Sequence, residues 1–357
     1  MNSSPTPQRR LSLLMPHIQF SHLFIKINLF FLLPILCIFC SLLIGPSHTL
    51  GIKSYFYWFL QLLFGITYFS SEQFALLQNI LWNVRLPRIL LTFMVGAALA
   101  TAGNGLQALF RNPLVDSYVL GISSGAAFGA ALALAFGLFS PNLFAFIFGV
   151  CAVLMTYLFA YRKQEQHTSL VMIILAGMIV SGLFLAGLTI IQYLSDPFKL
   201  QAIVQWTMGN LHQATWQKVQ YAFLPILIGL LGLFLMRWRL NLLALGTEEA
   251  KAVGIDPKWE QIILIALVTL CTSASVAAAG IISLYGLFMP HIVRMLVGPD
   301  HRITIPCNMV LGGCFLLLID NISRVLLSFE IPIGIFTMLL GAPFFLLLMK
   351  NKRMSWS

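Results

Sequence analysis

Long apolar runs, separated by short polar connections, recur along the chain from about residue 27 to residue 349. A helix needs about 20 apolar residues to cross the hydrocarbon core of a bilayer. The runs predict ten transmembrane helices, over about residues 27–45, 87–108, 114–136, 142–160, 170–193, 219–236, 259–280, 282–297, 306–328 and 332–349. The eighth run is short for a full crossing, so we expect a tilted or bent helix there.

The pattern predicts an all-α membrane protein with about ten transmembrane helices in one polytopic domain, over residues 26–350. A basic tail at 1–25 precedes this domain and a short tail at 351–357 follows it. The first apolar run lacks the small-residue cleavage site of a signal peptide, so we interpret it as a membrane helix. Composition agrees, because 59% of the residues are hydrophobic, 9% are charged and the mean hydropathy is +0.90. Soluble domains carry about a quarter charged residues.

The distribution of basic residues predicts the orientation of the helices. With the N-terminus inside, ten helices place 15 of the 21 Lys and Arg residues in the cytoplasm, and both tails lie there. The other six are Lys53, Arg85, Arg88, Lys199, Lys218 and Arg324. Counting the aromatic segment 55–69 as a further crossing reverses the bias to 8 inside and 13 outside, so we expect this segment along the outer interface. Cytoplasmic loops then explain the net charge of +10, and we expect no nucleic-acid partner.

The stretch from Arg85 to Ala131 contains two apolar runs that meet at residues 110–113. Pro113 disfavours helical geometry at Asn112, and Arg111 is costly inside hydrocarbon, so the first helix should end there. Small residues line one face of each run: Gly96, Ala100 and Gly103 in the first, and Gly121, Gly125 and Gly129 in the second. Because small side chains let helix backbones approach closely in lipid, we expect this pair of helices to pack tightly.

Two short motifs suggest chemistry that their context does not favour. Residues 103–108 match the dinucleotide-binding pattern G-x-G-x-x-G/A, which requires a preceding strand, but here they lie at the end of an apolar helix. Cys37 and Cys40 lie in an apolar run without acidic or histidine partners, which favours a packing role. We expect no disulfide framework and no metal site.

Asp320 is the acidic residue that we single out within the predicted helices, and its spacing from Arg324 allows the two to pair. Ion-coupled carriers place acidic residues or broken helices near the bilayer midplane, and we see no comparable pattern. We therefore infer that another subunit supplies the energy for any transport. An intramembrane enzyme needs a nucleophile with a base or clustered carboxylates, and the helices offer neither, so we expect no catalytic residue.

The longest cytoplasmic connection, residues 237–258, contains a short predicted helix. Thr247 can cap its N-terminus, Glu248 and Glu249 suit the positive end of the helix dipole, and Gly254 can end it. A helix this short is not stable alone in water, so it must pack against the membrane domain or a partner. An ordinary connecting helix and a partner contact both fit this pattern.

Several motifs follow one another in a characteristic order. They are RLPR at 85–88, LQALFRNPL at 106–114, LGISSGAA at 120–127, WTMGNL at 206–211, LALGTEEAKAVGI at 243–255, GIISLYGLFMPHIVRMLVGPDHR at 280–302, LLLIDNISR at 316–324 and EIPIGIFTMLLGAPFF at 330–345. Together they resemble the permease subunits of the FecCD family, type II ATP-binding-cassette importers of ferric siderophores, haem and vitamin B12. The resemblance covers about residues 85–350 and excludes the basic tail.

The resemblance implies two contact regions. The short helix, within about 241–256, looks like the coupling element that fits a groove of the cytoplasmic ATPase, through Leu245, Gly246, Glu248, Glu249, Ala250 and Gly254. Arg85, Arg88 and Arg324 resemble outward basic residues that meet acidic residues of a periplasmic binding protein. Arginines also pair with carboxylates at helix ends or extend to the interface, and for Arg324 the pair with Asp320 is an equal alternative.

The resemblance also implies a translocation pathway at the interface of two permease copies, lined by the fifth and tenth helices. In this sequence these helices offer Ser181, Thr189, Gln192, Thr337 and Met338, and the preceding loop 162–169, with Thr168, resembles the cytoplasmic gate. An uncharged pathway suits cargo that a binding protein delivers. Pro290, His291 and Arg294 match a family motif, and we interpret His291 as structural because it has no metal-ligand companions.

The expected assembly is therefore a bacterial inner-membrane importer that contains a permease homodimer, two ABC ATPase subunits and a periplasmic binding protein. In such an importer the ATPase subunits bind ATP and Mg²⁺. We therefore expect that this chain is a transport subunit without enzymatic activity and that it binds no cofactor. The resemblance favours an iron chelate such as a ferric siderophore as cargo, with haem or cobalamin next. The alternative is a stand-alone secondary carrier or channel without an ATPase partner.

Overall fold

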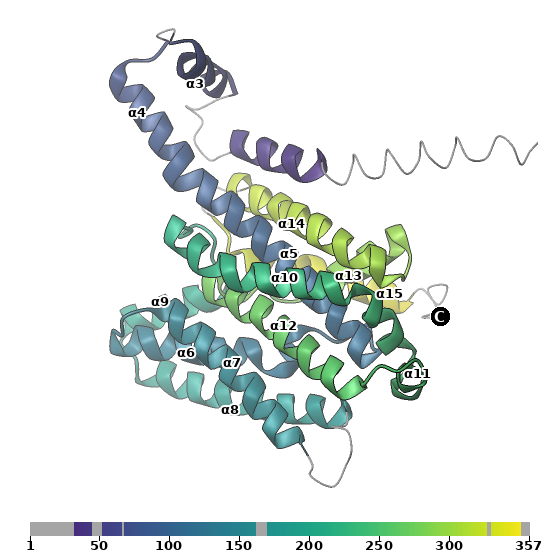
Figure 1. Cartoon of the computed structure of the whole chain (residues 1–357). Coiled ribbons are helices and arrows are strands. Elements are labelled where there is room, and N and C mark those ends of the chain that lie inside the picture. Colours follow the sequence, from purple (N-terminus) through teal and green to yellow (C-terminus); the bar gives the residue numbers. More distant parts are fainter. Residues whose placement is uncertain (1–31, 45–51, 66–67, 162–169, 327–329, 351–357) are drawn as a thin grey trace, which may run out of the picture.

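The computed structural model describes residues 32–44, 52–65, 68–161, 170–326 and 330–350, which form helices and connections without a strand (Figure 1). The helices of these ranges are Leu32–Leu43, α3 (Ile52–Phe64), α4 (Ser71–Asn79), the π-helical η1 (Ile80–Arg85), α5 (Leu86–Phe110), the 3₁₀-helical η2 (Ser117–Leu120), α6 (Ile122–Phe136), α7 (Pro141–Ala160), α8 (Leu170–Leu194), α9 (Pro197–Thr207), α10 (Trp216–Leu245), α11 (Thr247–Ala252), α12 (Pro257–Ala279), α13 (Tyr285–Val297), α14 (His301–Val325) and α15 (Ile333–Lys350).

The ten predicted membrane helices are confirmed by the described helices. Six of these are long and apolar enough to span a membrane, and four shorter apolar helices complete the set. Each of the ten falls on one predicted run, and the eighth, α13, is indeed short, with 13 residues. The chain is therefore a multi-pass membrane protein.

The second predicted helix is much longer than the apolar run indicated. α4, η1 and α5 form one continuous helix of 40 residues, Ser71–Phe110, whose α4 part projects from the bundle (Figure 1). Pro87 lies in its middle and lacks the N–H of a regular helix. The π-helical turn of η1 lies directly before Pro87 and accommodates the interruption. The predicted interfacial segment 55–69 contains most of α3, whose depth in a membrane stays a prediction.

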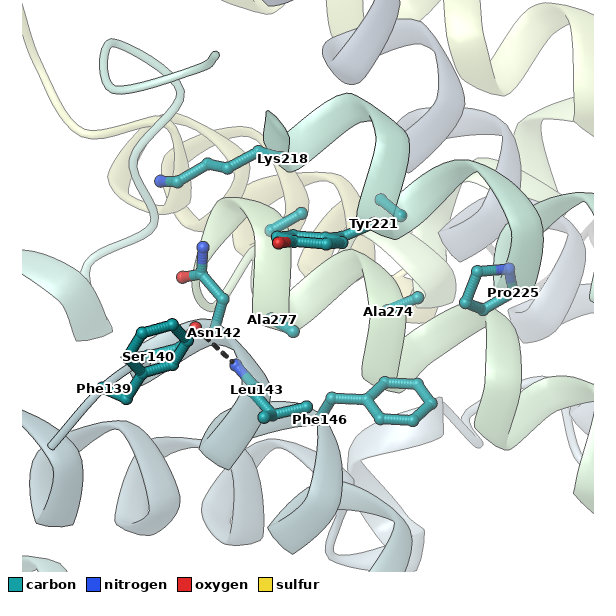
Figure 2. A pocket seen from close by; sticks show the side chains of 12 residues that line it. Phe139, Ser140, Asn142, Leu143, Phe146, Lys218, Tyr221, Pro225, Ala274 and Ala277 are labelled. Atoms are coloured by element: carbon teal, nitrogen blue, oxygen red, sulfur yellow. Dashed lines mark hydrogen bonds between the residues drawn. The ribbon is translucent and has the colours of Figure 1, made fainter. Parts of the chain in front are cut away.

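A cavity of about 350 Å³ lies between α7, α10 and α12 (Figure 2). α10 contains Pro225 in its interior, at the edge of this cavity. The lining comes from the first turns of α7 and α10 and the last turns of α12, so the cavity lies toward one end of the bundle.

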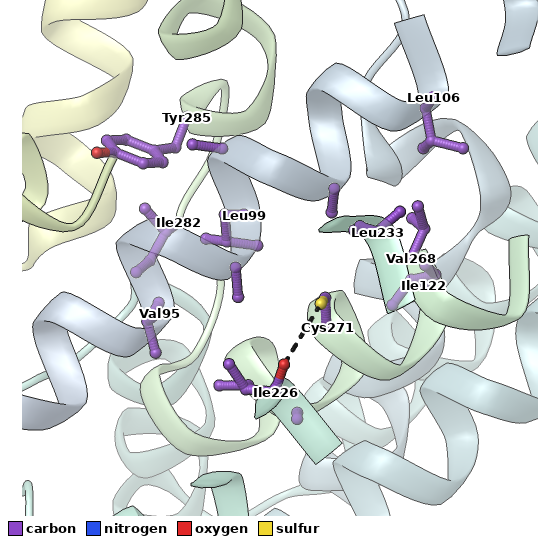
Figure 3. Close-up of a cluster of buried hydrophobic side chains, with 14 of the residues drawn as sticks. Val95, Leu99, Leu106, Ile122, Ile226, Leu233, Val268, Cys271, Ile282 and Tyr285 are labelled. Carbon is purple, nitrogen blue, oxygen red and sulfur yellow. Dashed lines mark hydrogen bonds between the residues drawn. The ribbon is translucent and has the colours of Figure 1, made fainter. Parts of the chain in front are cut away.

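α5 is the central helix of the bundle and packs against α10, α12, α13 and α14. Of its 25 residues 21 are buried, whereas only six of the 25 residues of α8 are buried. Val95, Leu99 and Leu106 of α5 lie in one core with Ile226 of α10 and Val268 of α12 (Figure 3). The helix that begins at the RLPR motif thus organises the fold.

The glycines of α5 and α6 allow the close approach of helix backbones that we expected. The partners are α13, α14 and α7, and the two helices do not pack on each other. A Cβ at Gly103 of α5 would overlap the carbonyl oxygen of Gly286 of α13, and a Cβ at Gly96 would lie 2.5 Å from the carbonyl oxygen of Gly312 of α14. On α6, Gly125 and Gly129 lie against the backbone of α7. The predicted packing of the two runs on each other is wrong, because each run uses its small face for a different neighbour.

The connection between α5 and α6 is longer than predicted. α5 ends at Phe110, as expected, with Arg111 in the left-handed region at φ 48°. α6 begins only at Ile122 and not near 114, because Asn112 Oδ1 accepts from Leu114 N at 2.9 Å and residues 111–116 form turns. Tyr118 donates its hydroxyl to the carbonyl of Ile282, at 2.7 Å, in the connection between α12 and α13. The two irregular connections therefore brace each other.

Candidate functional site

Two polar clusters mark opposite ends of the bundle. At one end, Trp216 Nε1 donates to the carbonyl of Trp82 at 2.9 Å, which joins the start of α10 to η1. Asp320 of α14 pairs with Arg88 at the start of α5 at this same end, which we call the arginine end. At the other end, Arg239 of α10 lies 2.6 Å from Glu260 of α12, close in sequence to α11. We call this the α11 end.

The predicted short helix is present as α11, and its ends differ slightly from expectation. Gly246, at φ 143°, is the N-cap, so Thr247 is the first helical residue and its predicted capping role is wrong. Gly254 ends the helix as predicted, at φ 86°, where its N–H donates to the carbonyl of Lys251 at 2.9 Å. This is the left-handed position that glycine tolerates without strain.

Some side chains in and beside α11 lie at the surface, whereas others are buried and anchor the helix. The side chain of Glu249 is exposed, and Leu245 is 63% exposed. Ala250 is fully buried, so it is no surface contact; instead it holds α11 against the bundle. The carboxylate of Glu249 and the guanidinium of Arg111 both lie against Gly246, next to the end of α5. The side chain of Glu248 lies outside the described part.

Asn241 and Asp300 connect α10 to α14 beside α11, a link that the sequence analysis missed. Asn241 donates to Asp300 at 2.7 Å and accepts the N–H of His301 at 2.8 Å. Arg302 lies 2.7 Å from the other carboxylate oxygen of Asp300. Hydrogen bonds from Arg302 and Asn241 hold the pKa of Asp300 well below its usual range. The position of Asp300 before a helix suggests a cap, but no local signal identifies Asn241 as its partner.

At the arginine end, α5, α14 and the segment before α15 share a charge cluster that is largely buried. Arg88 donates to Asp320 from Nε and Nη2, at 3.1 and 2.8 Å, and to Glu330 from Nη1, at 2.9 Å. Arg324 Nε lies 3.2 Å from the second oxygen of Asp320. The predicted pair of Asp320 and Arg324 is confirmed, and Arg88 is a further partner that the sequence did not indicate.

The three arginines at this end are buried, although the sequence predicted that they face outward. Arg85, Arg88 and Arg324 are 5%, 8% and 3% exposed. Arg85 donates to the carbonyl of Leu42 at 2.5 Å and lies over the ring of Tyr55, while Arg324 donates to the hydroxyl of Ser41 at 3.0 Å. The side chains therefore do not extend outward, because each guanidinium has a partner inside the protein: Leu42 for Arg85, Asp320 and Glu330 for Arg88, and Asp320 and Ser41 for Arg324.

The predicted pathway residues do not all face outward. Thr337 of α15 is fully buried, and its hydroxyl donates to the carbonyl of Gly334 at 3.0 Å, so it faces the interior of the subunit. Met338 is 50% exposed, Thr189 is exposed and Ser181 and Gln192 are half-buried. Thr168 and the predicted gate loop lie outside the described residues.

Asp116 is a buried carboxylate that the sequence analysis overlooked, although it lies within the third predicted crossing. Its Oδ1 accepts the N–H of Ser117 at 2.6 Å and lies against Gly286 of α13. It thereby caps η2 and fixes the irregular connection before α6. Its place shortly after Pro113 is the available signal for such a cap.

The other candidate groups have packing roles in the structure. His291 packs against the rings of Phe344 and Phe345, with centroids 5.9 and 6.5 Å away. In the described ranges, no three His, Cys, Asp or Glu side chains are grouped in a way that could hold a metal ion. All six cysteines are free thiols.

Comparisons with known proteins agree with this architecture. The model of the FecCD transport family matches residues 32–351. The molybdate import system permease protein MolB of Haemophilus influenzae is 44% identical over 283 residues, 77% of this chain and 82% of that protein. The hemin transport system permease protein HmuU of Yersinia pestis is 40% identical over 283 residues, 76% of this chain and 83% of that protein.

One solved structure has the same fold over nearly the whole chain. It is described as a metal-chelate type ABC transporter in an inward-facing conformation, and it matches with a TM-score of 0.78 at 37% identity, over 94% of this chain and 100% of that one. The chain belongs to the FecCD transport family, and it is a permease subunit of an ABC importer.

Proposed function

We propose that two copies of this permease form the translocation pathway of an importer that a separate ATPase drives. The observation that carries this proposal is the construction of α11. Buried Ala250 and the bonds between Asn241 and Asp300 fix the region, while Leu245 and Glu249 remain at the surface. An exposed element on a rigid support is suited to receive a partner and to pass on its movement.

Coupling requires that the ATPase contacts α11 differently in its ATP-bound and ATP-free states. Leu245 and Glu249 are the contact groups that the structure offers, and Gly246, Ala250 and Gly254 shape the helix that carries them. Glu248 completes the proposed set from the sequence. ATP and Mg²⁺ bind to the partner, and this chain performs no covalent chemistry.

The second copy is proposed to pack against α8 and α15. α8 is largely uncovered in the single subunit, with Ile179, Leu183 and Ile190 each about 60% exposed or more. A shared two-fold axis places the same face of each copy at the interface. Ser181, Thr189, Gln192 and Met338 are the pathway groups from these helices, with Thr168 in the preceding loop; the remaining apolar surface faces the lipid bilayer.

A periplasmic binding protein is proposed to dock at the arginine end. Glu330 is the more exposed member of the charge cluster, with a side chain 31% exposed, and it covers Nη1 of Arg88. A carboxylate of the binding protein can replace Glu330 on Arg88, since the guanidinium donates to any carboxylate in the same geometry. Arg85 and Arg324 are proposed as supporting residues, because Leu42 and Asp320 already engage them.

The proposed cargo is an iron chelate, such as a ferric siderophore, or haem or cobalamin. The relative named for hemin and the solved metal-chelate transporter support this class. Molybdate is a second candidate, because the permease named for it is 44% identical. The pathway groups carry no charge, so selection of the cargo rests with the binding protein.

The test is purification of the tagged chain from its native membrane in a mild detergent, followed by mass spectrometry of the intact complex. We expect two permease copies with two ATPase subunits, and a binding protein whose ligand identifies the cargo. Recovery of the permease alone, together with uptake into vesicles without an ATPase, would instead establish a stand-alone carrier or channel.

A further inference from the structure

The cavity between α7, α10 and α12 has one polar and one apolar end. The amine of Lys218, the carboxamide of Asn142 and the hydroxyl of Tyr221 point toward the same end (Figure 2). Phe146 and Pro225 lie at the other end, where the lining is apolar. A cavity of this kind suits an amphiphilic molecule, since each end matches one part of it.

Lys218 is a half-buried lysine whose amine has no hydrogen bond or ion pair with the described residues. Lys199, at the same end of the bundle, differs: its amine donates to the carbonyl of Ala135 at 2.7 Å and lies 3.8 Å from Asp196. An ammonium group offers three donors, and its partial burial is costly without an anionic partner. Lys218 therefore leaves a positive charge available at the mouth of the cavity.

A smaller hollow beside Lys218 adds further polar groups. It is lined by Asn210, Gln205 and Gln213 together with Lys218 itself. Side-chain amides can donate to the oxygens of an anion that the amine holds. The hollow and the cavity share Lys218, and together they offer the donors that a phosphate group requires.

The direction of the cavity follows the axis of the bundle. From Lys218 to Pro225, α10 advances about 10 Å at 1.5 Å per residue. α7 passes from Asn142 to Phe146 in the same direction, and the polar end lies nearest the ends of these helices. This is how a phospholipid lies in a bilayer, with its headgroup at the surface and its acyl chains toward the centre.

We propose that this cavity binds an anionic phospholipid. The phosphate contacts Lys218, Asn142 and the Tyr221 hydroxyl contact the headgroup, and an acyl chain packs against Phe146 and Pro225. Leu143 and Tyr221 of the cavity lining are 51% and 65% exposed, so the site opens to the outer surface of the bundle. The lipid is a better occupant than the cargo, because the proposed pathway groups lie on α8 and α15 and none of them lines this cavity. The choice of lipid over cargo rests on the proposed pathway, whereas the charge of Lys218 and the shape of the cavity do not.

The test measures the phospholipid retained by the full chain after extraction from its native membrane, by native mass spectrometry. We expect a bound anionic phospholipid on the wild type, and about tenfold less on Lys218→Gln, because one charged hydrogen-bonding partner is lost. Lys218→Arg keeps the charge and should retain the lipid. Lys199→Gln removes a lysine at the same end that does not line the cavity, and should also retain it.

A second measurement covers the case in which Lys218→Gln alters folding. Here the wild type and Ala277→Leu, a variant that narrows the cavity, are both delipidated. The Tm of each protein is then measured after addition of anionic phosphatidylglycerol and, separately, of zwitterionic phosphatidylcholine. Phosphatidylglycerol should raise the Tm of the wild type more than phosphatidylcholine does, and this difference should shrink in Ala277→Leu. Equal lipid retention by Lys218→Gln and wild type, or equal effects of the two lipids, would overturn the proposal.

Discussion

Nη2 of Arg88 lies 2.8 Å from Oδ1 of Asp320, and this ion pair joins the start of α5 to the end of α14 inside the protein. The two side chains are 10% and 1% exposed. Asp320→Asn leaves two buried guanidinium groups without their shared carboxylate. We expect a loss of about 3–5 kcal/mol of stability, because a buried charge without its partner is strongly destabilising. Thermal unfolding of the purified permease in detergent measures this change.

Glu330→Gln is the matched control for the same cluster. Glu330 also contacts Arg88, but its side chain is 31% exposed, so we expect a loss of about 1 kcal/mol or less. Similar losses for the two variants would show that burial does not determine the strength of these pairs.

Gly103→Ala tests the backbone contact between α5 and α13. The added Cβ meets the carbonyl oxygen of Gly286, so one helix must shift. Overpacking of this kind costs about 1–3 kcal/mol or more, and we expect a lower Tm and less folded protein in the membrane. Gly105→Ala on the same helix is the control, since a Cβ there lies 3.2 Å from the flexible Cδ1 of Leu264 and meets no backbone atom, so the Tm should fall much less.

Glu249→Lys tests the proposed contact on α11. The change reverses an exposed charge and places a cation at the positive end of the short helix dipole. We expect normal amounts of permease in the membrane. Uptake of the cargo should be lost, and the permease should no longer stimulate ATP hydrolysis by the partner ATPase. Glu72→Lys makes the same charge change on exposed α4 and should leave the ATPase contact intact. Full coupling in Glu249→Lys would remove this residue from the proposed interface.

Asn241→Ala tests the connection between α10 and α14. The variant keeps the ion pair of Asp300 with Arg302 but removes the hydrogen bond from α10 to Asp300. We therefore expect weaker coupling of ATP hydrolysis to uptake, with a small loss of stability. The lowered pKa of Asp300 means that its ionised form stabilises the fold above the ordinary carboxyl pKa of about 4 and loses this effect only as the pH falls further. Coupling measured from about pH 5 to pH 8 should therefore show no titration of this connection.

The number and order of the membrane helices could be predicted from the sequence, because bilayer thickness fixes the length of an apolar run. The ion pair of Asp320 and Arg324 could be predicted from helical spacing alone. Arg88 could not be assigned to Asp320, since 232 positions separate them and no periodic pattern connects two distant helices.

Other errors have the same origin. Small residues predict close helix packing, but they do not identify the neighbour, so the glycine faces of α5 and α6 were assigned to each other. The side of α15 that carries Thr337 is buried by tertiary packing that its uniformly apolar sequence does not reveal. Asp116 was missed because it lies in an apolar run, where one carboxylate changes the mean hydropathy only slightly.

α14 is held at both ends by polar clusters that belong to different faces of the protein. Asp300, before its first residue, is bonded to Asn241 beside α11, and Asp320, near its last turn, is bonded to Arg88. A helix of 25 residues is about 37 Å long. α14 thus connects the two proposed docking faces, with Pro306 as its natural point of bending. A movement beside α11 that shifts Asn241 is passed through Asp300 to α14, and one helix then extends to the arginine end.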